Sequence, residues 1–115
     1  MSIKRIKTGA RMSQAVVHGD TVYLAGQVAD NAKEDAAGQT KQILSKIEGL
    51  LAEAGTDKSK LLSATIWLTD MRYFDEMNKV WDAWVSPGNT PGRACVEARL
   101  ARADLLVEIG IIAAK

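Results

Sequence analysis

Several residue types on which common functional sites depend are scarce in this sequence. It contains one cysteine, Cys95, and one histidine, His18, in 115 residues. A single cysteine cannot close an internal disulfide, and one cysteine with one histidine cannot supply the ligands of a zinc site. The sequence therefore predicts neither an internal disulfide nor a metal centre.

Charge of one sign and long hydrophobic runs are also lacking. The formal net charge is +1 at pH 7, whereas a surface that binds phosphate backbones carries a marked basic excess. No run approaches the roughly 18 apolar residues that a membrane span requires, and the N-terminus lacks the apolar stretch of a signal peptide. We therefore expect a cytoplasmic protein with no nucleic acid and no membrane as partner.

The hydrophobic residues, 47% of the total, suffice for one globular domain over residues 1–115. Two stretches repeat them every three or four residues, which is typical of amphipathic helices. The first predicted helix runs from about Gly38 to Ala54, and Gly55 is placed to end it in a left-handed cap. The second contains Phe74 to Val85, and Asp70 is a candidate for its N-terminal cap.

Six further segments alternate apolar and polar residues and predict strands. They are residues 3–7, 14–18, 21–28, 61–68, 93–100 and 105–113. Gly19-Asp20 indicates a hairpin turn between the second and third, with His18 as an ordinary solvated residue at its tip. The order β-β-β-α-β-α-β-β predicts an α+β two-layer sandwich, with a mixed six-stranded sheet and both helices on one face.

The last two predicted strands each have one apolar face and a second face that mixes charged with apolar residues. Alternation assigns these mixed faces to the side of the sheet that the helices leave uncovered. The residues expected there are Trp67, Arg93, Cys95, Glu97, Arg99, Leu106, Glu108 and Ile112. Because a large exposed apolar patch usually marks an interface, this face predicts a closed homo-oligomer.

Two interpretations of the charged residues on this face remain open from the pattern alone. They could form a ladder of ion pairs between strands or subunits, since structural ion pairs are common. Alternatively, they could form a pocket for a small anion. Arg93, after the Pro91-Gly92 turn, would then clamp a carboxylate through two parallel hydrogen bonds, and Glu108 would take a proton from water.

Four segments carry a resemblance to a known family. They are Ala25-Gly26-Gln27, Asn78 in the second helix, Thr90–Glu97 and Val107-Glu108-Ile109. In this order and spacing the chain resembles the RidA/YjgF family of reactive intermediate deaminases from Met12 to Ala114. The resemblance implies a chorismate-mutase-like fold and a homotrimer whose inner sheet faces form a barrel. It also implies three sites, each in a cleft between subunits.

The resemblance further implies an activity. Family members with this arginine hydrolyse 2-imino acids and their enamine tautomers to 2-keto acids and ammonia, without a cofactor. On that basis Arg93 binds the substrate carboxylate, Glu108 activates the attacking water, and Cys95 and Gly26 line the pocket. Asn78 matches a position near the pocket, although a helix-margin asparagine without a catalytic part fits equally well. Cys95 is not expected to be a nucleophile, because no histidine is available to activate it.

The sequence departs from the family pattern at two positions on the substrate side of the pocket. Met12 replaces a tyrosine and Ala25 replaces a serine, so Arg11 or Trp81 become candidates for the missing contacts. These losses favour an alternative function, a trimer that binds a small carboxylate without turnover, whereas Glu108 favours an enzyme. An older family description, ribonuclease or translation inhibitor, is disfavoured because the sequence lacks a histidine pair and interleaved aromatic and basic residues.

Overall fold

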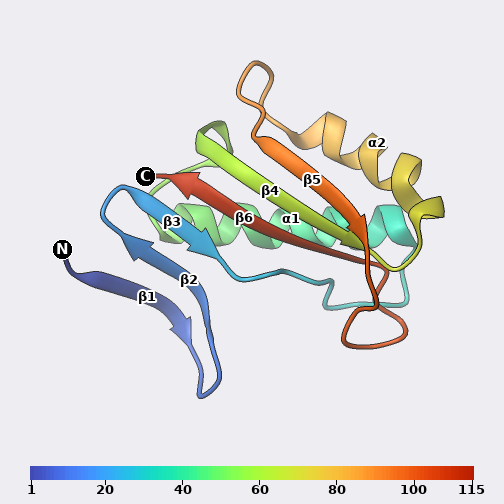
Figure 1. Ribbon diagram of the computed structural model, residues 1–115, viewed down its shortest axis with the longest axis horizontal. Coiled ribbons are helices and arrows are strands. Elements are labelled where there is room, and N and C mark those ends of the chain that lie inside the picture. Colours follow the sequence, from blue (N-terminus) through green and yellow to red (C-terminus); the bar gives the residue numbers. More distant parts are fainter.

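A six-stranded sheet packs against two helices in the computed structural model, which describes residues 1–115 (Figure 1). The strands are β1 (Ile3–Thr8), β2 (Ser13–His18), β3 (Thr21–Leu24), β4 (Leu61–Leu68), β5 (Gly92–Glu97) and β6 (Val107–Ala114). The helices are α1 (Ala36–Glu53) and α2 (Phe74–Trp84), with 3-10 turns at Lys58–Lys60 and Met71–Tyr73. The predicted α+β class, strand number and helix number are confirmed.

The strand order is β1-β2-β3-β6-β4-β5. Every neighbouring pair is antiparallel except β4 and β5, so the sheet is mixed, as predicted. The last strand of the chain, β6, lies in the middle between β3 and β4, and β5 forms one edge beside α2 (Figure 1). Consequently β6 has hydrogen-bonded neighbours on both sides, whereas β5 has only one.

The free backbone amides at the start of α1 are capped by acidic side chains that the apolar periodicity does not reveal. Asp35 Oδ1 accepts a hydrogen bond from Gly38 N at 2.8 Å, and Glu76 Oε2 of α2 accepts one from Ala37 N at 2.8 Å. These caps explain why α1 begins two residues earlier than predicted. Gly55, with φ of 87°, adopts the left-handed conformation expected after the helix. Neither helix combines the length and apolarity that a membrane crossing requires.

Other predicted boundaries also shift. Asp70 caps the 3-10 turn before α2 rather than α2 itself, because its Oδ1 accepts from Arg72 N at 2.9 Å. The strand β3 ends at Leu24, and beyond it only Gln27 pairs with β6, as an isolated bridge. The strand β5 ends at Glu97 rather than at residue 100. The hairpin turn between β2 and β3 lies where it was predicted.

The hydrophobic core lies between the helices and one face of the sheet. Alternate residues of β6 and one stripe of α1 supply much of it, and all are almost completely buried: Val107, Ile109, Ile111, Ala113, Ile43, Leu44, Ile47, Leu50 and Leu51. Burying a large aliphatic side chain contributes about 1.5–3 kcal/mol. This packing, more than local helix propensity, therefore holds α1 against the sheet.

The opposite face of the sheet carries no helix. The strand registers place on it Val16, Tyr23, Thr65, Trp67, Val96, Glu108 and Ile112. Tyr23 and Val96 are each 45% exposed, although both are large and hydrophobic. We call this surface the open face. Trp67, Glu108 and Ile112 lie on it, as the alternation predicts.

The strand β5 faces the other way from the prediction. It pairs in parallel with β4, so that Arg93 lies beside Ala64 and Cys95 beside Ile66. Laterally paired residues point to the same side of a sheet, and both partners in β4 are buried under the helices. Arg93 and Cys95 therefore lie on the helical side, and Val96 lies on the open face. Because an edge strand is exposed on both sides, its alternation of polar and apolar residues does not reveal which side is which.

Three more residues that were expected on the uncovered face lie elsewhere in the structure. Glu97 follows Arg93 and Cys95 to the helical side, where its Oε1 accepts a hydrogen bond from Met71 N at 2.9 Å. Arg99 lies beyond the end of β5. Leu106 precedes β6 and packs partly against the core. The charged residues of this region thus divide between the two sides of the sheet.

Candidate functional site

Arg93 is held by three side chains of α2. Its Nη1 donates to Asn78 Oδ1 at 2.7 Å, and its Cζ lies 5.9 Å from the ring centroid of Phe74 and 5.5 Å from that of Trp81. Both ring distances are within the range of cation–π attraction. The side chain is nevertheless exposed, and most of its five N–H donors are left for a ligand. A guanidinium fixed in this way is suited to bind a carboxylate through two parallel hydrogen bonds.

The sequence produces this arrangement through helical spacing and one crossover. Phe74, Asn78 and Trp81 stand at i, i+4 and i+7 in α2 and therefore share one flank of the helix. The parallel pairing of β4 and β5 requires α2 to cross over beside β5. That crossover brings the flank against Arg93. Asn78 thus has a definite partner, and Trp81, one candidate for the lost family contacts, lies beside the same guanidinium.

Cys95 lies two residues beyond Arg93 on the same side of β5 and packs partly against the core. Burial raises the pKa of the Cys95 thiol, and the charge of Arg93 offsets this only in part. The side chain therefore remains a neutral thiol near pH 7, and a neutral thiol is a weak nucleophile. Cys95 therefore lies beside Arg93 as a neutral, partly buried side chain.

Glu108 lies on the open face of β6, beside Trp67 of β4. Burial raises the pKa of its carboxyl above the usual glutamate range. Within the chain no ion pair engages it. Gly26 lies directly against it, since a Cβ added at Gly26 would collide with Glu108 Oε2. A half-buried, unpaired carboxylate with a raised pKa has the properties of a general base.

Gln27 fixes the segment that contacts Glu108. Its side chain is only 3% exposed, and its Nε2 donates to Gln14 Oε1 and to the carbonyl of Ala25, both at 2.9 Å. Its backbone exchanges two hydrogen bonds with Ile109, at 2.8 and 3.1 Å. The segment is therefore pinned against β6 next to Glu108. Sequence analysis used Gln27 only as part of a motif and did not foresee this role.

Gln39 anchors the backbone that leads into β6, and sequence analysis missed it. It is completely buried, and its Nε2 lies within hydrogen-bond distance of three carbonyls, including that of Asp104 at 3.0 Å. Its Oε1 accepts from Leu106 N at 2.9 Å, two residues before Glu108. A signal was present in the sequence, because Gln39 stands four residues before Ile43 and interrupts the apolar stripe of α1.

The site residues form two separate groups, which we call the arginine half and the glutamate half. The arginine half contains Arg93, Cys95 and Asn78 on the helical side, and the glutamate half contains Glu108 and Gly26 on the open face. The strand β4 lies between β5 and β6. One chain by itself therefore does not bring Arg93 and Glu108 together.

Two other candidates belong to neither half within the chain. Met12, 45% exposed, and Arg11 lie at the turn between β1 and β2.

No three His, Cys, Asp or Glu side chains converge in a way that could hold a metal ion.

Comparison with known proteins assigns the chain to a family. A family model described as Endoribonuclease L-PSP matches residues 2–115. A RutC family protein from Haemophilus ducreyi is 46% identical over 112 residues, which cover 97% of this chain and 96% of the relative. The RutC family protein YoaB from Escherichia coli is 45% identical over 114 residues, 99% of each chain.

Solved structures agree with the sequence relatives. The crystal structure of a YjgF family member from Neisseria meningitidis is similar with a TM-score of 0.98 and 50% identity, covering 100% of this chain and 96% of that one. These matches extend over essentially the whole fold described above. The chain therefore belongs to the RutC/YjgF family, the RidA/YjgF family that its four sequence segments resemble.

Proposed function

We propose that the protein is a 2-imino acid deaminase, which hydrolyses 2-imino acids and their 2-aminoacrylate-type enamine tautomers to 2-keto acids and ammonia. Such a hydrolase needs no cofactor and would repair damage by removing reactive metabolites in the cytoplasm. The observation that carries the proposal is the exposed Arg93 guanidinium, fixed by one amide and two aromatic rings. Membership of the RutC/YjgF family supports a role of this general kind.

The complete site would form between subunits of a homotrimer. Two observations support this assembly: the two halves lie on opposite sides of one sheet, and the open face exposes large apolar side chains such as Tyr23 and Val96. Covering that face with neighbouring subunits removes the apolar surface from water. A neighbour whose β5 edge packs there would carry its own Arg93 towards Glu108.

In this arrangement the chemistry needs only positioning and one proton acceptor. Arg93 would hold the substrate carboxylate, which places the imine carbon beside a water molecule on Glu108. The carboxylate of Glu108 takes a proton as the water oxygen bonds to that carbon and the C=N π electrons move to nitrogen. Glu108 returns this proton to the nitrogen, and the hydroxyl proton also passes to the nitrogen as the C=O bond closes and the C–N bond breaks, so that the nitrogen leaves as ammonia. Imino acid and water thus yield keto acid and ammonia.

A coupled assay tests the proposal. An amino-acid oxidase supplies 2-iminobutanoate or 2-iminopropanoate, and the disappearance of the imine is followed by its absorbance. The wild-type protein should accelerate the decay, and Arg93→Ala should reduce it to the uncatalysed rate while light scattering shows an unchanged oligomer. Arg99→Ala is the matched control, because this exposed arginine lies beyond β5 and outside both halves.

The alternative function, carboxylate binding without turnover, predicts a different result in the same experiment. The imine would then decay at its spontaneous rate in the presence of the protein, while 2-ketobutyrate would still bind saturably and in an Arg93-dependent manner. That outcome would contradict the deaminase proposal.

A further inference from the structure

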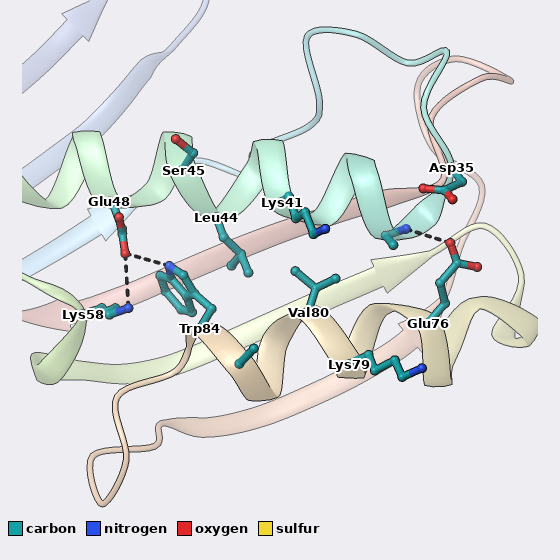
Figure 2. A pocket seen from close by; sticks show the side chains of 12 residues that line it. Asp35, Lys41, Leu44, Ser45, Glu48, Lys58, Glu76, Lys79, Val80 and Trp84 are labelled. Atoms are coloured by element: carbon teal, nitrogen blue, oxygen red, sulfur yellow. Dashed lines mark hydrogen bonds and ion pairs between the residues drawn. The ribbon is translucent and has the colours of Figure 1, made fainter.

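A groove runs between α1 and α2 on the helical side of the molecule (Figure 2). Its volume is about 870 Å³, within the range of roughly 300–1,000 Å³ typical of small-molecule sites. Leu44 of α1 faces Val80 of α2 across it, and Ala83 and Trp84 continue the apolar lining. The groove lies on the flank of α2 that faces α1, whereas Arg93 contacts the flank that faces β5.

Every carboxylate that lines the groove is already engaged by a donor of the protein. Asp35 and Glu76 each accept a hydrogen bond from a backbone amide in the first turn of α1, at 2.8 Å. Glu48 accepts one from Trp84 Nε1 at 2.8 Å and forms an ion pair with Lys58 Nζ at 3.3 Å. These bonds hold the three carboxylates in place, and the charge of Glu48 is also paired with Lys58.

Two lysines of the groove, by contrast, have no partner. Lys41 on α1 and Lys79 on α2 are exposed, and neither forms a hydrogen bond through its side chain or an ion pair. The groove thus combines an apolar lining with one lysine on each helix that forms no ion pair. An inorganic anion would match only the charge, and an uncharged apolar molecule would match only the lining.

The two ends of the groove limit what can lie in it. The cluster of Trp84, Glu48 and Lys58 stands at one end, and the hydrogen bond from Ala37 N to Glu76 joins the two helices at the other (Figure 2). A partner helix laid along the groove would have to pass through both. The closed ends therefore favour a short ligand over a peptide.

We propose that this groove is a second binding site, which takes a small organic carboxylate with an aromatic or branched aliphatic body. The carboxylate lies between Lys41 and Lys79, and the apolar body contacts Leu44, Val80 and the Trp84 indole. Buried apolar area supplies most of the affinity in such sites, and the charged pair selects the anion. This site is independent of the proposed deaminase chemistry.

Titration of the ¹⁵N-labelled full-length protein with naphthalene-1-acetate, followed by NMR, tests the proposal. The Trp84 indole N–H, identified by its loss in Trp84→Phe, should shift saturably together with the backbone amides that line the groove. The uncharged naphthalene-1-acetamide, which has almost the same shape, should bind about fivefold more weakly, as expected for the loss of two exposed ion pairs.

Charge variants make the result specific. Lys41→Gln combined with Lys79→Gln should abolish the preference for the acid over the amide, whereas Lys4→Gln combined with Lys33→Gln, which removes two lysines outside the groove, should leave it intact. Filling the groove with Ala83→Trp should remove the binding of both compounds, with circular dichroism confirming the fold.

Three outcomes would overturn the proposal. The first is a set of chemical-shift changes centred on the Trp67 indole of the open face, and the second is equal affinity for the acid and the amide. The third is a change in the chemical shifts of the groove with protein concentration in the absence of ligand, which would indicate that a second chain binds there. Because Lys41 and Lys79 lie outside both halves of the candidate active site, their double variant should also retain any imine hydrolysis. The two proposals can therefore fail separately.

Discussion

A mixture of two inactive variants would reveal whether the arginine half and the glutamate half come from different subunits. Arg93→Ala destroys the first half and keeps the second, and Glu108→Gln does the reverse. In a closed ring, each site joins the arginine half of one subunit to the glutamate half of the next. Random exchange at equal amounts leaves each half intact in half of the cases, so about one quarter of the sites are complete.

The structure indicates that both variants fold. Arg93 is exposed on an edge strand, and its removal costs chiefly the hydrogen bond to Asn78, so that we expect a loss of stability of about 1 kcal/mol. Glu108→Gln keeps the shape of the side chain and removes a charge that burial disfavours. Losing the two charge-assisted bonds from Arg93 to a substrate carboxylate should slow hydrolysis at least about a hundredfold, so restored activity stands well above that background.

The assay measures imine hydrolysis per mole of protein after the two variants have been unfolded together and refolded. Native mass spectrometry confirms that mixed oligomers form. As a control, Arg93→Ala is mixed with the Arg93→Ala, Glu108→Gln double variant, a combination in which no site can be complete. Mixed oligomers without recovered activity would refute the division of the site between subunits, because sites built from one chain are all defective in this mixture.

Three other predictions concern single groups of the site. Asn78→Ala should raise KM about five- to tenfold with a smaller change in kcat, because Arg93 loses the acceptor that orients it; steady-state kinetics with an unchanged KM would leave Asn78 as an ordinary helix-margin residue. Gly26→Ala should slow hydrolysis about a hundredfold by pushing the Glu108 carboxylate aside. Its control, Gly49→Ala, adds a Cβ that meets nothing within 4 Å and should raise the unfolding free energy by about 1 kcal/mol in a denaturant titration. Because burial raises the pKa of Glu108, its base form appears only at higher pH, and kcat should fall on the acid side with a midpoint above the ordinary value of about 4.3; a midpoint at or below that value would contradict the assignment of Glu108 as base.

The fold was predictable because the spacing of apolar residues reflects burial in a core that one chain forms by itself. The stripe of α1 and the alternation of β6 both record burial in the same core, and both were read correctly. The orientation of β5 was not predictable in this way, because an edge strand exposes both sides and leaves little hydrophobic signal. The side to which Arg93 points is set by its place beside Ala64 in the β4–β5 register, and this register is known only from the tertiary structure.

The candidate site was predictable only as a set of residue names. The family resemblance selects Arg93 and Glu108, but a linear motif does not say that they lie on opposite sides of a sheet. The contacts of Phe74 and Trp81 with Arg93 were also missed, because an aromatic residue on an amphipathic helix is read as core. The structural role of buried side-chain amides such as Gln39 was also missed, because their hydrogen-bond partners are distant in sequence.

The unequal neighbours of β5 and β6 have a consequence for the dynamics of the molecule. A central strand exposes its amides to hydrogen exchange only through large-scale opening, whereas an edge strand opens locally at a lower free-energy cost. In the isolated chain we therefore expect the backbone amides around Glu108 to exchange more slowly than those around Arg93.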